Sequence, residues 1–140
     1  MYVAAPRQVS WFNSATGFGT LGYAAPAAIG AALGDPARPV VSLLGDGGFQ
    51  YTLAELGSAR DCDADVAFLV WNNSGYMEIE TSMISAEITP IGVTPCAPDF
   101  SAVAAAYGLP SRRVTTREAI ITALQELPRP CLIEFVDGSG

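Results

Sequence analysis

Two short polar segments of the chain combine residue types that bind a phosphate through a divalent cation. They are Gly45-Asp46-Gly47-Gly48 and Asn72-Asn73-Ser74-Gly75. Glycine has no Cβ, so its backbone N–H group can come close to a phosphate. The carboxylate of Asp46 would repel a bare phosphate, and a magnesium ion between the two would remove that conflict. Because magnesium prefers oxygen ligands and the side chains of Asp46 and Asn73 supply them, the two segments together predict a magnesium and phosphate site.

Each segment follows a short apolar run that predicts a buried strand. Residues 39–44 (PVVSLL) and 66–71 (VAFLVW) are almost wholly apolar, which is typical of parallel strands covered on both faces. Open parallel sheets bind ligands at the carboxyl ends of their strands, so both segments are expected to face one site. Either segment alone would also fit a glycine-rich turn or an asparagine cap. The pair is the more specific signal.

The rest of the chain alternates predicted helices with predicted strands. The predicted helices span 22–33, 53–60, 100–107 and 117–127, and two further predicted strands span 112–114 and 131–136. Residues 74–97 predict a short helix followed by an irregular loop, since two prolines and a glycine interrupt their second half.

Capping residues support three of these helices. Thr52 and Glu55 have the Thr-x-x-Glu spacing of a capping box, which favours a structural role for Glu55. Asp99 and Thr116 are expected to cap the last two helices. The order of elements predicts a single α/β domain over residues 1–140, with a doubly wound, mostly parallel sheet flanked by helices.

Composition and charge exclude several classes of function. The net charge of -7 disfavours binding to nucleic acid or to anionic membrane surfaces. No apolar run approaches the roughly 20 residues that span a bilayer. The 3 cysteines form no CxxC pair, so we expect no disulfide framework or zinc site and a reducing, cytoplasmic environment. The chain has no histidine, so catalysis must depend on a cofactor or a partner chain.

The spacing of Gly45-Asp46-Gly47 and Asn72-Asn73 resembles the signature of thiamine-diphosphate-binding domains. The surrounding sequences GTLGYAAPAAIGAALG, VVSLLGDGGFQYTLAEL and WNNSGY are similar to those of the acetolactate synthase and 2-oxo-acid decarboxylase superfamily. This resemblance implies the cofactors thiamine diphosphate and Mg²⁺.

The resemblance also implies a role for individual residues. The metal ligands would be the side chains of Asp46 and Asn73 and the backbone carbonyl of Gly75. Gly47 and Gly48 would bind the diphosphate through their N–H groups. Two further residues, Gly45 and Tyr76, would also contact the cofactor.

The segment Gly17-Phe18-Gly19-Thr20-Leu21-Gly22 supports two interpretations. The resemblance implies that the pyrimidine ring lies against it, that the Gly19 carbonyl accepts a hydrogen bond from the exocyclic amino group, and that Leu21 supports the bent cofactor, with Thr20 between them. The same residues fit the G-x-G-x-x-G fingerprint of a dinucleotide-binding oxidoreductase. That fingerprint normally follows a buried strand directly, and residues 10–16 (SWFNSAT) are too polar for one. The thiamine interpretation is therefore favoured.

The resemblance further implies that this domain needs a second one. Members of the superfamily activate the cofactor with a glutamate on another domain, so we expect no catalytic residue in this chain. The first strand and helix of the cofactor domain are also expected to be missing. A pyrimidine-side domain or partner subunit, a homo- or hetero-oligomer and a 2-oxo acid substrate follow from this resemblance. A non-catalytic module that only binds diphosphate remains the alternative.

Glu78 and Glu80 raise a question of substrate. Ile79 lies between them, at a position where pyruvate-decarboxylase-like members carry a glutamate. An apolar residue at this position resembles the synthases instead. The stretch NSATGFGTLGY resembles decarboxylases acting on guanidino 2-oxo acids. Either glutamate is therefore a candidate for recognising a cationic substrate tail, and a solvated helix face is the alternative.

Overall fold

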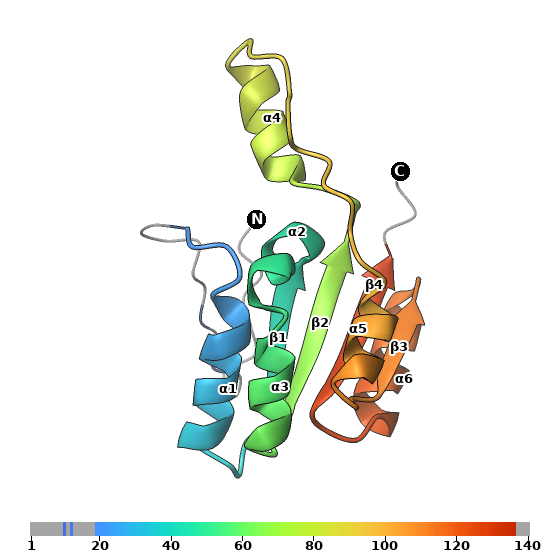
Figure 1. Ribbon diagram of the computed structural model, residues 1–140. Helices are drawn as coiled ribbons and strands as arrows, with labels where there is room; N and C mark the ends of the chain where they lie inside the picture. The colour runs from blue at the N-terminus through green and yellow to red at the C-terminus, as the bar shows by residue number, and fades with distance from the viewer. Residues whose placement is uncertain (1–9, 11, 13–18, 137–140) are drawn as a thin grey trace.

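The fold is a four-stranded parallel sheet with helices on both faces. The computed structural model describes residues 10, 12 and 19–136. The strands are β1 (Val40–Gly45), β2 (Val66–Asn72), β3 (Ser111–Val114) and β4 (Cys131–Val136). Their order in the sheet is β1-β2-β4-β3, and all three pairings are parallel. Figure 1 shows the carboxyl ends of β1, β2 and β4 at the same edge of the sheet. The predicted doubly wound α/β fold is confirmed.

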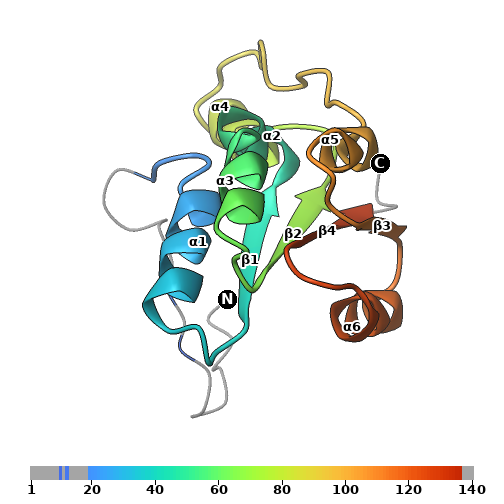
Figure 2. The ribbon, with the colours of Figure 1, turned by 60° about the horizontal axis from the view of Figure 1, so that its bottom comes forward.

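The helices divide unequally between the two faces of the sheet. They are α1 (Ala24–Gly34), α2 (Asp46–Phe49), the 3-10 helix η1 (Gln50–Thr52), α3 (Glu55–Asp61), α4 (Met77–Ser85), α5 (Phe100–Ala106) and α6 (Arg117–Glu126). Helices α1, α3 and α5 cover one face, and α6 lies on the opposite face beneath β3 and β4 (Figure 2). The β1 end of that second face carries half-exposed Val41 and Leu43, which no described helix covers.

The larger part of the core lies under α1, α3 and α5. Its centre is Phe49, whose ring stacks against Phe68 of β2 and Phe100 of α5 with centroids 6.0 and 5.8 Å apart. All three side chains are fully buried. Burial of one such side chain is worth about 1.5–3 kcal/mol, so these rings fix α2 and α5 on the sheet. A smaller cluster around Ile133 packs between the sheet and α6.

One predicted cap is wrong, and the reason lies at the end of β1. Helix α2 begins at Asp46, directly after the strand, and the chain continues through η1 into α3, which begins at Glu55 with no side-chain capping bond. Thr52 therefore lies inside a helical run. Its hydroxyl donates a hydrogen bond to the carbonyl of Gly22 at 3.1 Å instead of capping a helix.

The other two predicted caps are confirmed. The carboxylate of Asp99 accepts hydrogen bonds from the first turn of α5, and the hydroxyl of Thr116 accepts one from Ala119 in α6. Residues 74–97 form a short helix followed by irregular chain, as predicted. That helix, α4, projects beyond the carboxyl edge of the sheet (Figure 1). No helix in the described part of the chain is long and apolar enough to cross a bilayer.

Candidate functional site

The candidate site is a cavity at the carboxyl ends of β1 and β2. Gly45 and Trp71 are neighbours across these two strands, so the polar segments that follow them begin side by side. The cavity has a volume of about 430 Å³ and is lined from three parts of the chain, within 19–24, 43–48 and 71–79. Its lining includes every residue that the sequence predicts for the cofactor and the metal: Gly19, Thr20, Leu21, Gly45, Asp46, Gly47, Gly48, Asn73, Gly75 and Tyr76.

Asp46 is the charged group at the bottom of this site. Its side chain is 0% exposed, and its Oδ2 atom has no hydrogen-bond partner among the described residues. A buried carboxylate oxygen without a partner is costly, and a cation is the usual compensation. In the described part of the chain, no three His, Cys, Asp or Glu side chains gather around one point. A metal ion bound to Asp46 would therefore need amide or carbonyl oxygens as its other protein ligands.

Asn73 and Gly75 bring two more polar groups to Asp46. One terminal atom of the Asn73 amide lies 3.0 Å from the carbonyl oxygen of Gly75 and 3.1 Å from Oδ1 of Asp46. As nitrogen, this atom donates a hydrogen bond to both oxygens. As oxygen, it completes a set of three oxygens that face one another, which a cation between them would stabilise. The residues present therefore fit a magnesium ion.

Three glycines that line the cavity are required by close packing. A Cβ on Gly47 would collide with the ring of Tyr76, and a Cβ on Gly75 would lie 2.8 Å from the carbonyl oxygen of Val93. Gly22 has a φ of +81° and would bring a Cβ to 2.9 Å from the carbonyl oxygen of Gly48. The segment that ends at Gly22 is thereby held against the turn after β1.

Comparison with known proteins identifies the family. Residues 1–135 match the family described as thiamine pyrophosphate enzyme, C-terminal TPP binding domain. The chain belongs to this family. Thiamine diphosphate, typically with Mg²⁺, is the cofactor of such domains, so the predicted family and cofactor are confirmed. The family match also favours the thiamine interpretation of the segment 17–22 over the dinucleotide one, although Gly17 and Phe18 themselves lie outside the described residues.

Relatives of this thiamine-diphosphate-binding domain are decarboxylases and acetolactate synthases. The probable 2-ketoarginine decarboxylase of Pseudomonas aeruginosa is 47% identical over 78% of this chain, which covers 19% of that protein. The acetolactate synthase isozyme 1 large subunit of Escherichia coli is 33% identical over 91% of this chain and 23% of that protein. The solved 4-hydroxybenzoylformate decarboxylase of Rhodococcus jostii matches 85% of this chain and 24% of its own chain with 32% identity and a TM-score of 0.74. The chain thus spans about a fifth to a quarter of the length of these relatives.

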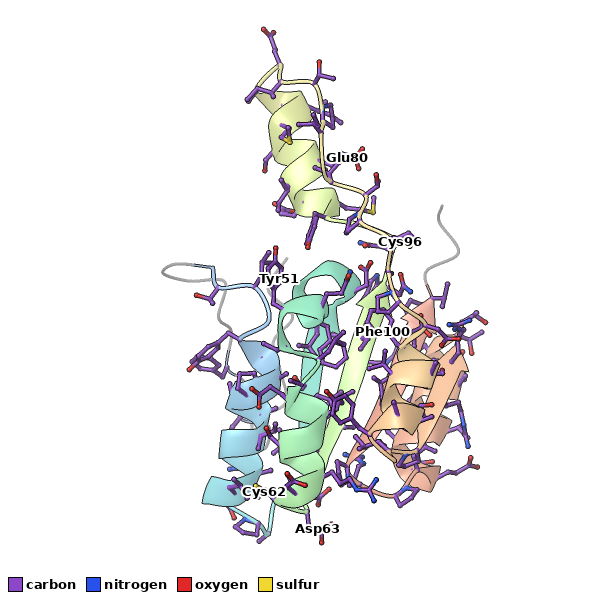
Figure 3. The ribbon with its side chains drawn as sticks, in the orientation of Figure 1. Tyr51, Cys62, Asp63, Glu80, Cys96 and Phe100 are labelled. Atoms are coloured by element: carbon purple, nitrogen blue, oxygen red, sulfur yellow. The ribbon has the colours of Figure 1, made fainter. Side chains whose placement is uncertain are left out.

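Two tyrosines interact beside the candidate site: Tyr76 lines the cavity, and Tyr51 bonds to it from outside the lining. Tyr51 projects from η1 toward the side where α4 begins (Figure 3). A hydrogen bond with Tyr51 raises the pKa of Tyr76, and burial and the negative charge of Asp46 raise it further. The Tyr76 hydroxyl therefore stays neutral at physiological pH and lies 3.4 Å from the carbonyl oxygen of Gly47, to which it can donate. The ring of Tyr76 thus covers the turn at Gly47.

The two candidate glutamates of α4 differ in position. Glu78 lines the cavity together with Met77 and Ile79, whereas Glu80 does not. No residue of α4 is buried, so neither glutamate is needed to hold the helix on the sheet. Of the two, Glu78 is placed to face a substrate in this cavity.

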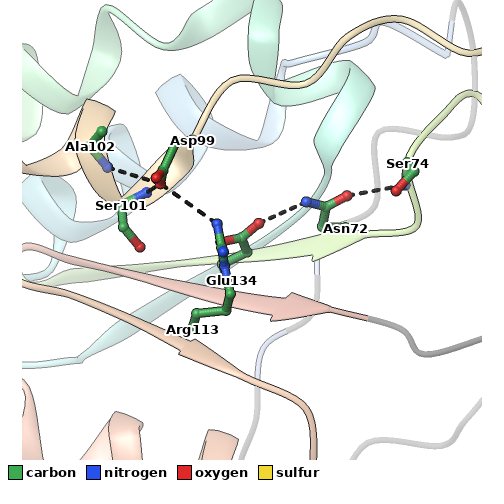
Figure 4. A network of polar contacts seen from close by, with 7 residues as sticks. All are labelled: Asn72, Ser74, Asp99, Ser101, Ala102, Arg113 and Glu134. Carbon is green, nitrogen blue, oxygen red and sulfur yellow. Dashed lines mark hydrogen bonds and ion pairs between the residues drawn. The ribbon is translucent and has the colours of Figure 1, made fainter.

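A polar network that the sequence does not predict lies directly beside the site. It connects Asn72, Ser74, Asp99, Arg113 and Glu134, and its dashed contacts are drawn in Figure 4. Hydrogen bonding to Glu134 and the charge of that carboxylate raise the pKa of Arg113. The two side chains form a salt bridge with a distance of 2.7 Å between Nε and Oε2. The signal available in the sequence was a single glutamate inside an otherwise apolar strand, CLIEFV.

Proposed function

We propose that this domain binds the diphosphate end of thiamine diphosphate through a magnesium ion, as part of an enzyme that decarboxylates or ligates 2-oxo acids. Asp46, Asn73 and the carbonyl of Gly75 would hold the metal. The observation that carries this assignment is the buried carboxylate of Asp46. Its Oδ2 has no hydrogen-bond partner among the described residues, and its Oδ1 and the carbonyl oxygen of Gly75 lie 3.1 and 3.0 Å from one terminal atom of the Asn73 amide.

The remaining residues of the cavity have separate roles in this proposal. Gly47 and Gly48 would offer backbone N–H groups to the diphosphate, because no Cβ keeps a phosphate away. Gly19, Thr20 and Leu21 would contact the pyrimidine side, and Gly45 and Tyr76 would border the diphosphate. When bound, the cofactor supplies the nucleophilic carbon and the electron sink needed to break the bond next to the carbonyl of a 2-oxo acid.

The whole enzyme would need more than this domain. The full sequence contains no histidine, and the described cavity has no carboxylate other than Asp46 and Glu78 in its lining. An activating glutamate would come from a pyrimidine-side domain, of the same chain or of a partner subunit in an oligomer. The free thiols of Cys62, Cys96 and Cys131 fit a reducing compartment such as the cytoplasm.

Magnesium-dependent binding tests the cofactor assignment. Titration calorimetry of the full chain with thiamine diphosphate should give binding with Mg²⁺ and none with a chelator. Asp46→Asn should weaken the binding by about a hundredfold, because it removes the anionic metal ligand. Asp63→Asn is the matched control at the opposite edge of the sheet, and it should bind as the wild type does. Equal affinity with and without Mg²⁺ would overturn the proposal.

We also propose that the substrate is a 2-oxo acid with a cationic tail, such as a guanidino group, recognised by Glu78. Two observations support this substrate class. Glu78 lines the cavity on a helix with no buried residue, and a relative 47% identical to the chain is a probable 2-ketoarginine decarboxylase. An ionic hydrogen bond is worth about 1.5–3 kcal/mol, which is enough for substrate selection.

The assembled enzyme can test this substrate class directly. Glu78→Gln should lower kcat/KM for a guanidino 2-oxo acid by roughly ten- to hundredfold and leave that for pyruvate unchanged. Glu80→Gln is the control, since Glu80 lies outside the cavity lining on the same helix. Equal turnover of both substrates by the wild type, or equal effects of the two variants, would contradict the role of Glu78.

A further inference from the structure

A buried carboxylate lies in the middle of the sheet next to the site. Glu134 of β4 is 1% exposed, on the face of the sheet that α5 covers. Its Oε1 atom accepts a hydrogen bond from Nδ2 of Asn72 at 2.7 Å, and its Oε2 atom accepts one from Nε of Arg113 at 2.7 Å. A carboxylate buried in an apolar strand is costly unless both oxygens are paired, and here both are.

Asn72 carries this contact into the loop that holds the proposed metal ligands. While its Nδ2 donates to Glu134, its Oδ1 accepts a hydrogen bond from the backbone N–H of Ser74 at 3.0 Å. Ser74 has a φ of +64°, a conformation that a serine rarely adopts without support. Ser74 lies between Asn73 and Gly75, so its conformation determines where these two groups point.

The other side of Glu134 is fixed as well. Arg113 of β3 also lies 3.6 Å from the carboxylate of Asp99, which accepts the N–H groups of Ser101 and Ala102 at the start of α5. The guanidinium group is thus held between two carboxylates, and its fork matches that role. Figure 4 shows the chain of contacts running from α5 through Arg113 and Glu134 to Asn72.

We propose that Glu134 is a positioning residue: through Asn72 it fixes the turn at Ser74 and so aims the Asn73 side chain and the Gly75 carbonyl at Asp46. The two neighbouring asparagines thus have different roles: Asn72 is oriented by Glu134 of the sheet, and Asn73 is directed to the metal. The part that concerns the metal rests on the proposed function. The part that concerns the turn stands on the contacts alone.

A swap of partners tests the contact between Asn72 and Glu134. Glu134→Gln leaves one acceptor oxygen for two donors, and the charged guanidinium of Arg113 should take it, so that an NH2 group faces Nδ2 of Asn72. Asn72→Asp places a carboxylate against a carboxylate. Each single change therefore removes the hydrogen bond between residues 72 and 134. In the double variant Asn72→Asp/Glu134→Gln, the introduced glutamine donates to the introduced aspartate and still accepts from Arg113. The aspartate can still accept from Ser74, and the total charge equals that of the wild type.

Hydrogen exchange of backbone amides in the full chain, without cofactor, reads out the turn. Each single variant should accelerate exchange at Ser74 by roughly tenfold, while the double variant should return it to near the wild-type rate. Exchange at Phe68 in the middle of β2 should be unchanged, which separates local loosening from a general loss of stability. Glu126→Gln is the matched control, because it breaks the ionic pair with Arg112 of the same 2.7 Å length away from the site.

Calorimetry of the same variants addresses the metal. With Mg²⁺ present, Glu134→Gln should bind thiamine diphosphate about ten- to hundredfold more weakly than the wild type, and the double variant should recover most of that loss. Unchanged exchange at Ser74 in both single variants, or a double variant no better than either, would overturn the positioning role. If the wild type itself binds no thiamine diphosphate, the proposed function fails, and the exchange rates still decide the role of Glu134.

Discussion

The sheet and the projecting residues 77–92, which we call the arm, differ in almost every physical respect. In the sheet, the rings of Phe49, Phe68 and Phe100 are fully buried against one another. In the arm no residue is buried, and Ile91 is 83% exposed. Helix α4 projects from the carboxyl edge of the sheet in Figure 1. The sheet therefore carries the stability of the domain, and the arm contributes little to it.

This difference matters for function because the arm supplies part of the cavity wall. Met77, Glu78 and Ile79 line the cavity from the first turn of α4. Residues outside the core can change with little cost in stability, so a substrate preference can change there while the cofactor site stays intact. Asp46 and Gly47, which we propose for the metal and the diphosphate, are instead buried where α2 leaves the sheet.

The largest expected effect concerns the reactivity of thiols. Cys131 is buried in β4, and burial raises the pKa of its thiol by more than the positive charge of Arg129 lowers it. Cys96, just beyond the arm, is exposed. Because thiolate is the reactive form and Cys131 needs the sheet to open, Cys96 should react with a thiol reagent at least about a thousandfold faster. Stopped-flow labelling of variants that retain one cysteine each would measure this ratio, and similar rates would contradict a closed sheet.

The next effect is on the free energy of unfolding. Phe68→Ala should lower it by about 3–5 kcal/mol, because the change leaves a cavity beneath α3 and α5. Ile84→Ala in the arm removes an exposed side chain and should change it by less than about 0.5 kcal/mol. Urea denaturation followed by circular dichroism would compare the two variants. A loss of similar size in both would show that the arm packs against the domain more than its exposure indicates.

Substitutions at two glycines should have smaller effects on stability, in opposite directions. Gly47→Ala should cost about 1–3 kcal/mol, because the added methyl group collides with the ring of Tyr76. Gly30→Ala lies in α1 with nothing within 4 Å of the added methyl group, so it should stabilise the domain by about 0.5–1 kcal/mol. Melting temperatures should therefore move in opposite directions. A shift of both in the same direction would mean that Tyr76 does not hold the turn after β1.

The smallest effect is a gain in stability when Asp46, the proposed metal ligand, is replaced. Without metal or cofactor, Asp46→Asn should raise the free energy of unfolding by roughly 1 kcal/mol, because it removes a buried charge whose Oδ2 has no partner among the described residues. Asp63→Asn, at an exposed turn, should leave it unchanged. Thermal melts in the presence of a chelator would measure both. A clear loss of stability in Asp46→Asn would show that the carboxylate supports the fold rather than the ligand.

Sequence alone predicted the strands, most of the helices and the residues proposed for the site. The apolar runs before Gly45 and Asn72 gave two strands within a residue of their observed bounds, and the caps at Asp99 and Thr116 are local signals that short-range hydrogen bonds make reliable. The capping box at Thr52 failed because α2 begins straight after β1, so that Thr52 bonds to Gly22, thirty residues away in sequence. The sequence pattern of a capping box is present, but the Thr52 hydroxyl bonds to a residue that is distant in sequence and caps no helix.

The surroundings of Glu134, in contrast, depend on how the strands are arranged in three dimensions. The sequence shows one glutamate among apolar residues and gives no partner for it, because Asn72 is 62 residues away and Arg113 is 21 residues away. The strand order places β4 between β2 and β3, and that order brings both partners to the two oxygens of one carboxylate. Local patterns specify strands and caps through neighbouring residues, whereas a buried network depends on which strands become neighbours in the sheet.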